Sequence, residues 1–481
     1  MLAGVVPARA FPLPSWLDVS GRLYGLAIVD TGGGPRQRPE AIGTLEVQAR
    51  PTRALRAVLE LRGRAGGPFE GGPGPEVYNF DQTFQNYSPS LEIRQAFLEW
   101  RGGRTEVRAG IQTFAWGKLD GVPPTDVVNP RDWHDPLVVD EFFEEQKIGI
   151  PALVGTYSLP DAPRLDLRGV RLSLGWIPFA VPPRLPLLLE RWFPPSITPG
   201  AGLCVTMKGR VDNAPCSGGE LPLAIDLSTR NDEPPRTLAT GGIAARVSGS
   251  WRRGDFDLYH YTGPETAPDV SLHAVAFKSG TAVQTIADLT QATHTMHMTG
   301  ADAAFPVGDF TVRAEVAWFV DHSYLRPTSD VLADVRVGKH KRDAILDGKH
   351  RDVPLGALFP RLNSVEWGMG ADTLWHGFRP LLQLNQIFIL GSAPRLLIAN
   401  PESRIAATLS RRFLDDRLEF EVRGLWEIEQ GALYVFPRVS YQLRDDLWLR
   451  AGYLVLTGPR DSVLGQFRAN DEVVFQARMT F

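Results

Sequence analysis

Residues 471–481 have the sequence DEVVFQARMTF. Because successive side chains of a β-strand point to opposite faces, this segment would divide into an apolar face and a polar face. The apolar face would hold Val473, Phe475, Ala477, Met479 and Phe481, and the other face Val474, Gln476, Arg478 and Thr480. A long strand of this kind that ends on an aromatic residue is typical of the last strand of a transmembrane β-barrel.

The same alternation recurs along the chain and is most regular in residues 363–373 and 417–426. We therefore predict an all-β fold, a single antiparallel transmembrane β-barrel of about 18 strands. Sixteen strands are the nearest alternative, because residues 264–289 could form either a loop or a further hairpin. The connections alternate between short and long, as expected for short periplasmic turns and long outer loops.

A large soluble all-β protein would also alternate apolar and polar residues, so alternation alone does not decide the fold. The expected strands, however, have about 10 residues or more, whereas strands of soluble proteins commonly have about 5 or 6. Tryptophans also lie near strand ends, where they would form the aromatic girdles of a membrane barrel. They are Trp100, Trp176, Trp251, Trp318, Trp375, Trp426 and Trp448.

The composition excludes several other classes of protein. The 481 residues include 51 Lys and Arg against 55 Asp and Glu, a formal net charge of −4. A nucleic-acid-binding protein would show an excess of basic residues instead. No apolar run is long enough for a transmembrane helix. The sequence also contains no phosphate-binding, dinucleotide-binding or metalloprotease motif, so we expect no cofactor, no metal and no enzymatic activity.

We expect residues 1–17 to be an N-terminal segment, whose Ala8-Arg9-Ala10 resembles the end of a signal sequence, and residues 18–481 to be the barrel. Residues 62–89, 115–146, 179–240 and 321–360 are rich in Gly, Pro or polar residues and are expected to be its long loops. Cys204 and Cys216, the only cysteines, are close together in one of these loops. Their spacing favours a disulfide in an oxidising compartment over free thiols or a metal site.

The segment GIQTFAWGKLDGVPPTDVVNPRD, residues 110–132, resembles the signature of an uncharacterised family of Gram-negative outer-membrane barrels that is catalogued as a domain of unknown function. The match consists of a strand ending in G-x-Q, then W-G-x-x-D-G, then D-V-x-N-P-x-D. The resemblance implies a porin-like barrel integral to the outer membrane. Because the activity of that family is not established, the resemblance implies no catalytic residue.

The loop at residues 115–146 is too long for a simple hairpin connection and is rich in carboxylates. One hypothesis is that it folds inward and narrows the lumen through Trp116, Asp120, Asp126, Asn129 and Asp132, where carboxylates would favour cations. The alternative is that Asp126, Asn129 and Asp132 only cap turns while Trp116 anchors the loop to the wall.

Charged residues of the strands are expected to face the lumen, because a charge on the lipid side would cost about 2–4 kcal/mol for Arg or Lys at the membrane midplane. The predicted lumen charges are Glu106, Arg108, Arg313, Glu315, Glu366, Arg417, Glu419, Glu421, Arg423 and Arg478. Their mixed signs indicate a hydrated lumen rather than a strongly selective one.

Two further segments have competing interpretations. His294, Met296 and Met298 would share one face, a pattern that could bind copper but is more often apolar filler on a lipid-facing strand. The basic residues of 336–351 could contact lipopolysaccharide phosphates, although a solvated loop is the simpler interpretation.

These observations favour a porin-like channel for small solutes, with no nucleic-acid partner. A non-conducting barrel that docks a partner is the alternative. An outer-membrane lipid-modifying enzyme is less favoured, because no strand carries a Ser or Thr beside a His on the outer rim. The expected partners are outer-membrane lipid, lipopolysaccharide and the barrel-assembly machinery, for which the terminal Phe481 resembles a recognition signal.

Overall fold

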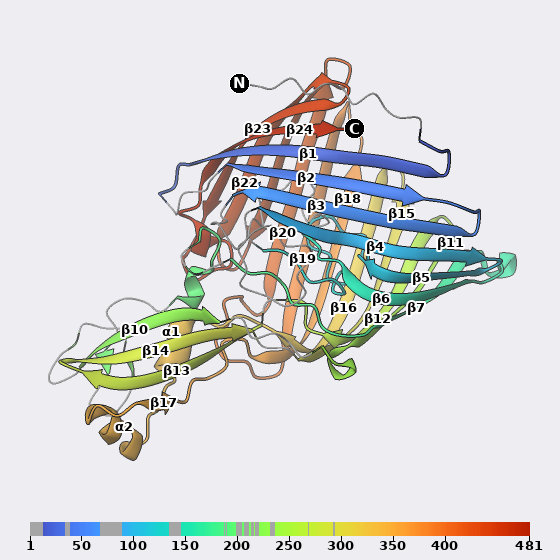
Figure 1. The fold of residues 1–481 in the computed structure, drawn as a ribbon. Coiled ribbons are helices and arrows are strands. Elements are labelled where there is room, and N and C mark those ends of the chain that lie inside the picture. The colour runs from blue at the N-terminus through green and yellow to red at the C-terminus, as the bar shows by residue number, and fades with distance from the viewer. Residues whose placement is uncertain are drawn as a thin grey trace.

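The computed structural model describes residues 13–33, 39–67, 89–133, 146–186, 188, 190–198, 204–205, 211–212, 216, 221–230, 236–267, 269–291 and 294–481. In this part of the chain an 18-stranded antiparallel sheet closes into a barrel, because β24 pairs with β1 (Figure 1). The closed barrel confirms the predicted fold class and strand number. Closure also leaves no strand edge exposed to lipid.

The first nine barrel strands are β1 (Leu17–Asp30), β2 (Glu40–Ala49), β3 (Leu55–Gly66), β4 (Ser90–Gly102), β5 (Thr105–Gln112), β6 (Ile150–Ser158), β7 (Leu167–Ile177), β11 (Gly242–Trp251) and β12 (Gly254–Pro264). The other nine are β15 (Thr295–Val307), β16 (Phe310–Ser323), β18 (Arg361–Thr373), β19 (Phe378–Leu390), β20 (Glu402–Phe413), β21 (Leu418–Glu427), β22 (Ala432–Arg444), β23 (Leu447–Thr457) and β24 (Glu472–Thr480).

The closing strand has the two faces that its sequence predicts. Phe475 is 51% exposed on the outside, whereas the next residue, Gln476, is 8% exposed on the inside. Leu98, Leu258 and Phe420 are likewise exposed on other strands. Such a belt of large apolar side chains would be unfavourable in water and is stable in the hydrocarbon core of a membrane.

Two groups of exposed tryptophans mark the ends of this apolar belt. Trp100, Trp251 and Trp375 lie near the end of the barrel that carries the short turns, and Trp176 and Trp426 lie near the opposite end. Trp448 is an exception to the prediction. It pairs with Arg478 and lines a cavity with Arg450 inside the barrel, so it does not belong to a girdle.

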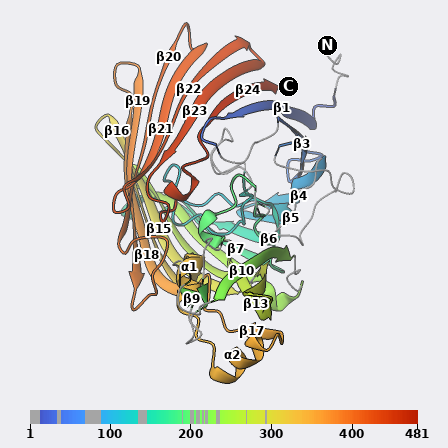
Figure 2. The same ribbon diagram turned by 90° about the vertical axis from the view of Figure 1, so that its left-hand side faces the viewer.

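Three long connections combine into a second, six-stranded sheet outside the barrel, projecting away from the C-terminus (Figures 1 and 2). Its strands and helices are β8 (Cys204–Val205), β9 (Val211–Asp212), β10 (Leu221–Arg230), β13 (Val270–Ser279), β14 (Ala282–Gln291), β17 (Arg351–Val353), α1 (Thr328–Ala333) and α2 (Lys339–Leu346). The hairpin of β13 and β14 therefore settles the alternative left open at residues 264–289: it forms, but outside the barrel. We call this six-stranded sheet with α1 and α2 the outer subdomain.

The outer subdomain has a topology that the barrel lacks, because β10 pairs in parallel with β14. Parallel pairing requires a long connection, which the return of the chain through β11 and β12 of the barrel supplies. Cys204 and Cys216 form a disulfide in this subdomain, with Cα atoms 5.5 Å apart. Residues 1–12 of the expected N-terminal segment, 68–88 of the first loop and 134–145 of the second lie outside the described residues.

The connection between the barrel and the outer subdomain is built around buried ionisable groups. Nδ1 of His294 lies 2.7 Å from an oxygen of Asp269, and its Nε2 lies 2.7 Å from the carbonyl oxygen of Asp321. Burial lowers the pKa of His294, but these two acceptors raise it by more, so the pKa lies above its ordinary value. The imidazole can donate to both acceptors at once only when it is protonated.

Candidate functional site

The connection between β5 and β6, residues 113–149, follows the inner wall of the barrel in its described part. The indole of Trp116 packs on the ring of Tyr259 in β12, with centroids 4.8 Å apart. The N–H of Gly117 donates to the hydroxyl of Tyr259 at 3.2 Å. This side of the lumen is apolar, since Met296 and Met298 are fully buried in the same cluster as Trp116.

Lys118 attaches the loop to three strands. Its ammonium group bonds the carboxylates of Asp257 and Asp302, the latter at 2.5 Å. The backbone N–H groups of Lys118 and Leu119 donate to Oε1 of Glu315, the latter at 2.6 Å. Both aspartates and Glu315 are almost fully buried. Lys118 supplies a counter-charge to the two aspartates, and Arg246 of β11 supplies a second one to Asp257 at 2.8 Å.

Asn129 holds the loop to the strands that it connects. Its Oδ1 accepts from the N–H of Phe114 at 2.7 Å, and its Nδ2 donates to the carbonyl oxygens of Gln112 and Ile148 at 3.3 and 2.8 Å. These three bonds join the exit of β5 to the entry of β6. Asn129 therefore occupies a fixed structural position.

Two of the three predicted aspartates of the loop, Asp126 and Asp132, form buried ion pairs. Asp126 forms ion pairs with Arg131 and with Nζ of Lys147, the latter at 2.9 Å. Asp132 lies 3.3 Å from Arg64 and 3.6 Å from Arg184. Both carboxylates are buried, so their charge is neutralised within the loop and the wall.

Asp120 differs from these residues because its side chain is 58% exposed to the lumen. It lies 3.4 Å from Arg313, which also pairs with Asp372. These three residues line a cavity of about 810 Å³, together with Arg423 of β21. The turn residue Leu374 also lines it, so the cavity occupies the short-turn half of the barrel. We call this cavity the vestibule.

Other segments narrow the opposite half of the barrel, where Figure 2 shows parts of the chain between the walls. Arg191, between β7 and β8, lies 2.7 Å from Glu472 and 3.3 Å from Asp30. The hydroxyl of Ser196 donates to Gln466, between β23 and β24, at 2.8 Å. Trp192 is buried beside Phe467 in an apolar cluster on the inner wall. These contacts hold segments of the chain inside this half of the barrel.

The predicted lumen charges lie on the inner wall, with one exception, and most pair with a neighbouring strand. Their partners are Arg101 for Glu106, Glu99 for Arg108, Tyr324 for Glu366, Arg412 for Glu419 and Arg438 for Glu421, while Arg423 pairs with Glu421 of its own strand. Arg478 lines a cavity of about 210 Å³ with Arg450 and Trp448. Arg417 is the exception: it lies exposed in the turn before β21 instead of in the wall.

The prediction that Met296 and Met298 face lipid is wrong. Met296 and Met298 face the lumen, not lipid, because they share a face with Asp302, and that shared face is visible in the sequence.

Lys118, Asp257 and Tyr259 were not among the predicted site residues. Nothing local in the sequence relates them, since the loop and β12 are more than a hundred residues apart. In the described part of the chain, no cluster of His, Cys, Asp and Glu is placed to hold a metal ion.

The family model described as "Protein of unknown function (DUF1302)" matches residues 62–374. The chain belongs to this family. The DUF1302 match covers the chain from β4 to β18, which includes the inward loop and every element of the outer subdomain. The sequence has no significant match among curated proteins.

Several solved outer-membrane structures are similar to this DUF1302 chain. OccAB4 of Acinetobacter baumannii has 11% identity and a TM-score of 0.46, with 97% of this chain and 98% of that chain covered. OccD3 (OpdP) of Pseudomonas aeruginosa has 8% identity and a TM-score of 0.46, with coverage of 97% and 91%. Wzi of Escherichia coli, a carbohydrate-binding β-barrel, has 9% identity and a TM-score of 0.43, with coverage of 96% and 84%.

The closed barrel and its apolar outer belt place this DUF1302 protein in the Gram-negative outer membrane as an integral protein. In the described residues, no helix has the length and apolar character needed to cross a membrane.

Proposed function

We propose that this protein is a porin-like channel that admits small polar solutes through a lumen narrowed by inward-folded loops. The vestibule carries the proposal, because it is an open cavity of about 810 Å³ inside a closed barrel. Charged side chains line its wall beside apolar ones, whereas a barrel that served only as a scaffold would have no need of a cavity of this size.

Charge in the vestibule is balanced, so the proposed channel discriminates mainly by size. The acidic lining residues are Asp120, Asp309 and Asp372, and the basic ones are Arg313, Arg379 and Arg423. Because opposite charges line the same space, we expect uncharged and zwitterionic solutes to enter more easily than ions of either sign. Trp116, Asp126, Asn129 and Asp132 would hold the loop in place, and Asp120 would be the member that meets the solute.

Liposome swelling tests the proposal directly. Purified protein reconstituted into liposomes should cause swelling with small amino acids and sugars, at rates that fall steeply as the solute becomes larger. Liposomes without protein provide the background, and the heat-modifiable gel mobility of the sample confirms that the barrel is folded. Swelling at the background rate for all solutes would overturn the channel.

The second candidate, a non-conducting barrel that docks a partner, is favoured by the segments that narrow the outer half. The ion pairs of Arg191 with Asp30 and Glu472 hold one of these segments across the mouth. The outer subdomain would then be the docking element, and its basic residues between 336 and 351 would contact lipopolysaccharide phosphates. Background swelling together with retention of the folded protein on lipopolysaccharide-coated beads would favour this candidate.

The enzyme alternative gains one observation that the sequence analysis missed. Near the long-loop end of the outer wall, the hydroxyl of Thr262 lies 3.1 Å from Nε2 of His260 and 3.0 Å from Nδ1 of His297. Nδ1 of His260 in turn lies 2.9 Å from the hydroxyl of Thr299. A nucleophile and base of the usual kind would need a third group that orients the imidazole, commonly a carboxylate, and the hydrogen bonds described for these histidines run to threonine hydroxyls. We therefore do not propose hydrolytic activity.

A further inference from the structure

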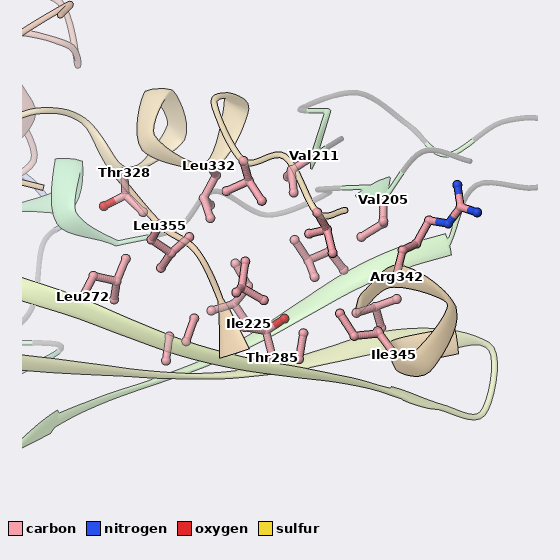
Figure 3. Close-up of a pocket in the computed structure, with 18 of the residues that line it drawn as sticks. Val205, Val211, Ile225, Leu272, Thr285, Thr328, Leu332, Arg342, Ile345 and Leu355 are labelled. Atoms are coloured by element: carbon pink, nitrogen blue, oxygen red, sulfur yellow. The ribbon is translucent and has the colours of Figure 1, made fainter. Parts of the chain in front are cut away.

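The vestibule has the volume of a binding site. Its 810 Å³ fall within the range of about 300–1,000 Å³ that is usual for small-molecule sites in proteins. The outer subdomain also contains a cavity, where side chains from its sheet and from α1 and α2 point toward one another (Figure 3). That cavity has a volume of only about 60 Å³ and a mostly aliphatic lining. Of these two cavities, the vestibule is therefore the one that can hold a whole solute.

The charges of the vestibule wall are separated by sign. The wall is formed by β16, β18, β19, β20 and β21, which pair in this order. Two acidic lining residues lie at one end of this series, Asp309 just before β16 and Asp372 in β18. Two basic ones lie farther along it, Arg379 in β19 and Arg423 in β21. We call these the acidic end and the basic end of the vestibule.

The strand register gives the separation of the two ends. Asp372 pairs with Leu381, Leu381 with Thr408 and Thr408 with Arg423, so these four residues form one row across the wall. Neighbouring strands are about 4.8 Å apart, so roughly 14 Å separate the backbones of Asp372 and Arg423. Side chains that point into a closed barrel converge, which brings the charged groups closer together than the backbones.

Carboxylates outnumber cations at the acidic end. Arg313 is shared between Asp372 and the loop residue Asp120, which lies 3.4 Å from it. Asp309 forms no ion pair with any residue that the structure describes. Three carboxylates and one guanidinium therefore line this end, which favours a cationic group of a solute.

The basic end offers guanidinium groups to an anion. Arg379 is exposed and forms no ion pair within the described part of the chain. Arg423 contacts Glu421 of its own strand, and this carboxylate also contacts Arg438 of β22 at 2.8 Å. Guanidinium groups bind carboxylates through charge-assisted hydrogen bonds, so this end favours a carboxylate of a solute.

The wall between the two ends is uncharged. Leu381 of β19, Ala406 of β20 and Leu425 of β21 line it, together with the hydroxyl-bearing Thr408 and Ser410. These side chains are short or aliphatic, so the middle of a bound solute would meet little charge. An aliphatic or weakly polar segment between two charged groups would complement this part of the wall.

We propose that the vestibule binds an elongated zwitterion, such as an ω-amino acid, with its ammonium group beside Asp120 and Asp309 and its carboxylate beside Arg379 and Arg423. This inference rests on the proposed channel, because it names the class of solute that the channel selects. Two or three residues of extended chain span at most about 7 to 10 Å. A zwitterion of about that length would reach both ends, whereas the adjacent charges of glycine would not. The affinity must be modest, since a conducted solute has to leave again.

Ligand-observed saturation-transfer NMR tests the site without requiring conduction. The sample is the folded full chain in lipid nanodiscs, the probe is 6-aminohexanoate, and empty nanodiscs provide the background. We expect saturable binding. Hexanoate, hexylamine and glycine should each bind about five-fold more weakly or less, because each of them meets only one end of the vestibule. Equal binding of 6-aminohexanoate and either singly charged analogue would overturn the proposal.

Matched variants test the basic end. Arg379→Gln with Arg423→Gln should weaken binding of 6-aminohexanoate about five-fold and leave binding of hexylamine unchanged. Arg417→Gln removes an exposed arginine of the turn before β21, outside the vestibule lining, and should bind like the wild type. If the double variant does not fold, judged by its gel mobility, Arg379→Gln alone provides the test. A folded variant with the affinity of the wild type would overturn the assignment of the carboxylate to this end.

Asp309→Asn tests the acidic end in the same way. It should weaken binding of 6-aminohexanoate and leave binding of hexanoate unchanged. Comparison with liposome swelling separates this site from the channel. Saturable binding with swelling at the background rate would support the site and overturn the channel. Swelling without binding would overturn the site and leave the channel in place.

Discussion

Gly117 and Lys118 connect a short motif of the inward loop to barrel strands that lie far away in the sequence. Gly117 has a φ of +85°, and a Cβ added there would lie 2.8 Å from Pro123 and 2.9 Å from Glu315. Only glycine fits this conformation without displacing its neighbours. The turn places Lys118 against Asp257 and Asp302, so the inward course of the loop depends on two adjacent residues.

Lys118→Met should lower the free energy of unfolding by roughly 3 to 5 kcal/mol, because it leaves the buried carboxylate of Asp302 without its cation and Asp257 with Arg246 alone. Lys118→Arg keeps the charge and should lose much less. The temperature at which the folded form disappears in semi-native gels measures the effect. Equal melting of the Met and Arg variants would contradict the role assigned to the charge.

Substitutions at Asp120 and Arg313 should shift the ion selectivity of the proposed channel in opposite directions. Asp120→Asn should lower the permeability ratio of cations over anions by roughly two-fold, a modest effect because salt screens a half-exposed carboxylate. Arg313→Gln should raise the same ratio. Reversal potentials in a salt gradient measure both. Identical ratios in the wild type and both variants would mean that ions do not pass beside this pair.

At the scale of elements, β24 joins the two edges of the sheet. The N–H of Phe481 donates to the carbonyl oxygen of Gly21 at 3.0 Å, and the N–H of Gly21 donates to Phe481 at 2.9 Å. A Cβ on Gly21 would lie 2.4 Å from the Phe481 ring. The ring therefore fits here only because residue 21 has no side chain. The ring itself is 59% exposed, which leaves it accessible before and after closure.

Deletion of Phe481 should therefore reduce the yield of assembled barrel far more than it changes the melting of the barrels that form. Phe481→Tyr keeps an aromatic end and should assemble normally. The folded fraction in isolated outer membranes measures yield. Unchanged yield after the deletion would argue against an assembly signal at this residue.

The junction formed by His294 should depend on pH. Its pKa is raised above the ordinary 6.5, so its contribution is fully present below about 6.5 and is lost as the pH rises through the raised pKa. Amide hydrogen exchange of β13 and β14, corrected for intrinsic rates, should show less protection at about pH 9 than at about pH 6. His294→Gln should reduce the difference. Greater protection at the higher pH would contradict the assignment.

The predictability of these elements follows from the range of the interactions that form them. Barrel strands were predictable because alternation and short turns are local properties of the sequence, as in residues 363–373. The outer subdomain was not, because β10 also alternates and only its pairing with β14, about sixty residues later, distinguishes it from a barrel strand. Trp448 shows a missed local signal. It shares a face with Arg450, so alternation alone directs it into the lumen.

At the scale of the whole molecule, the barrel combines an open vestibule with a narrowed outer half and an outer subdomain. Of the predicted constriction residues, Asp120 faces open space, whereas Trp116, Asp126, Asn129 and Asp132 are buried. The sequence indicated the loop but could not separate these roles, because burial depends on how the loop meets strands far along the chain. The proposed channel therefore requires that ions and small solutes pass along the space that the loops leave open.

Single-channel recording in planar lipid bilayers tests this most directly. We expect small, discrete conductance steps from the folded protein, with larger steps from Lys118→Met because the inward loop is less firmly held. Folded protein that inserts into the bilayer and shows no conductance at any voltage, in the wild type and in the variant, would contradict it.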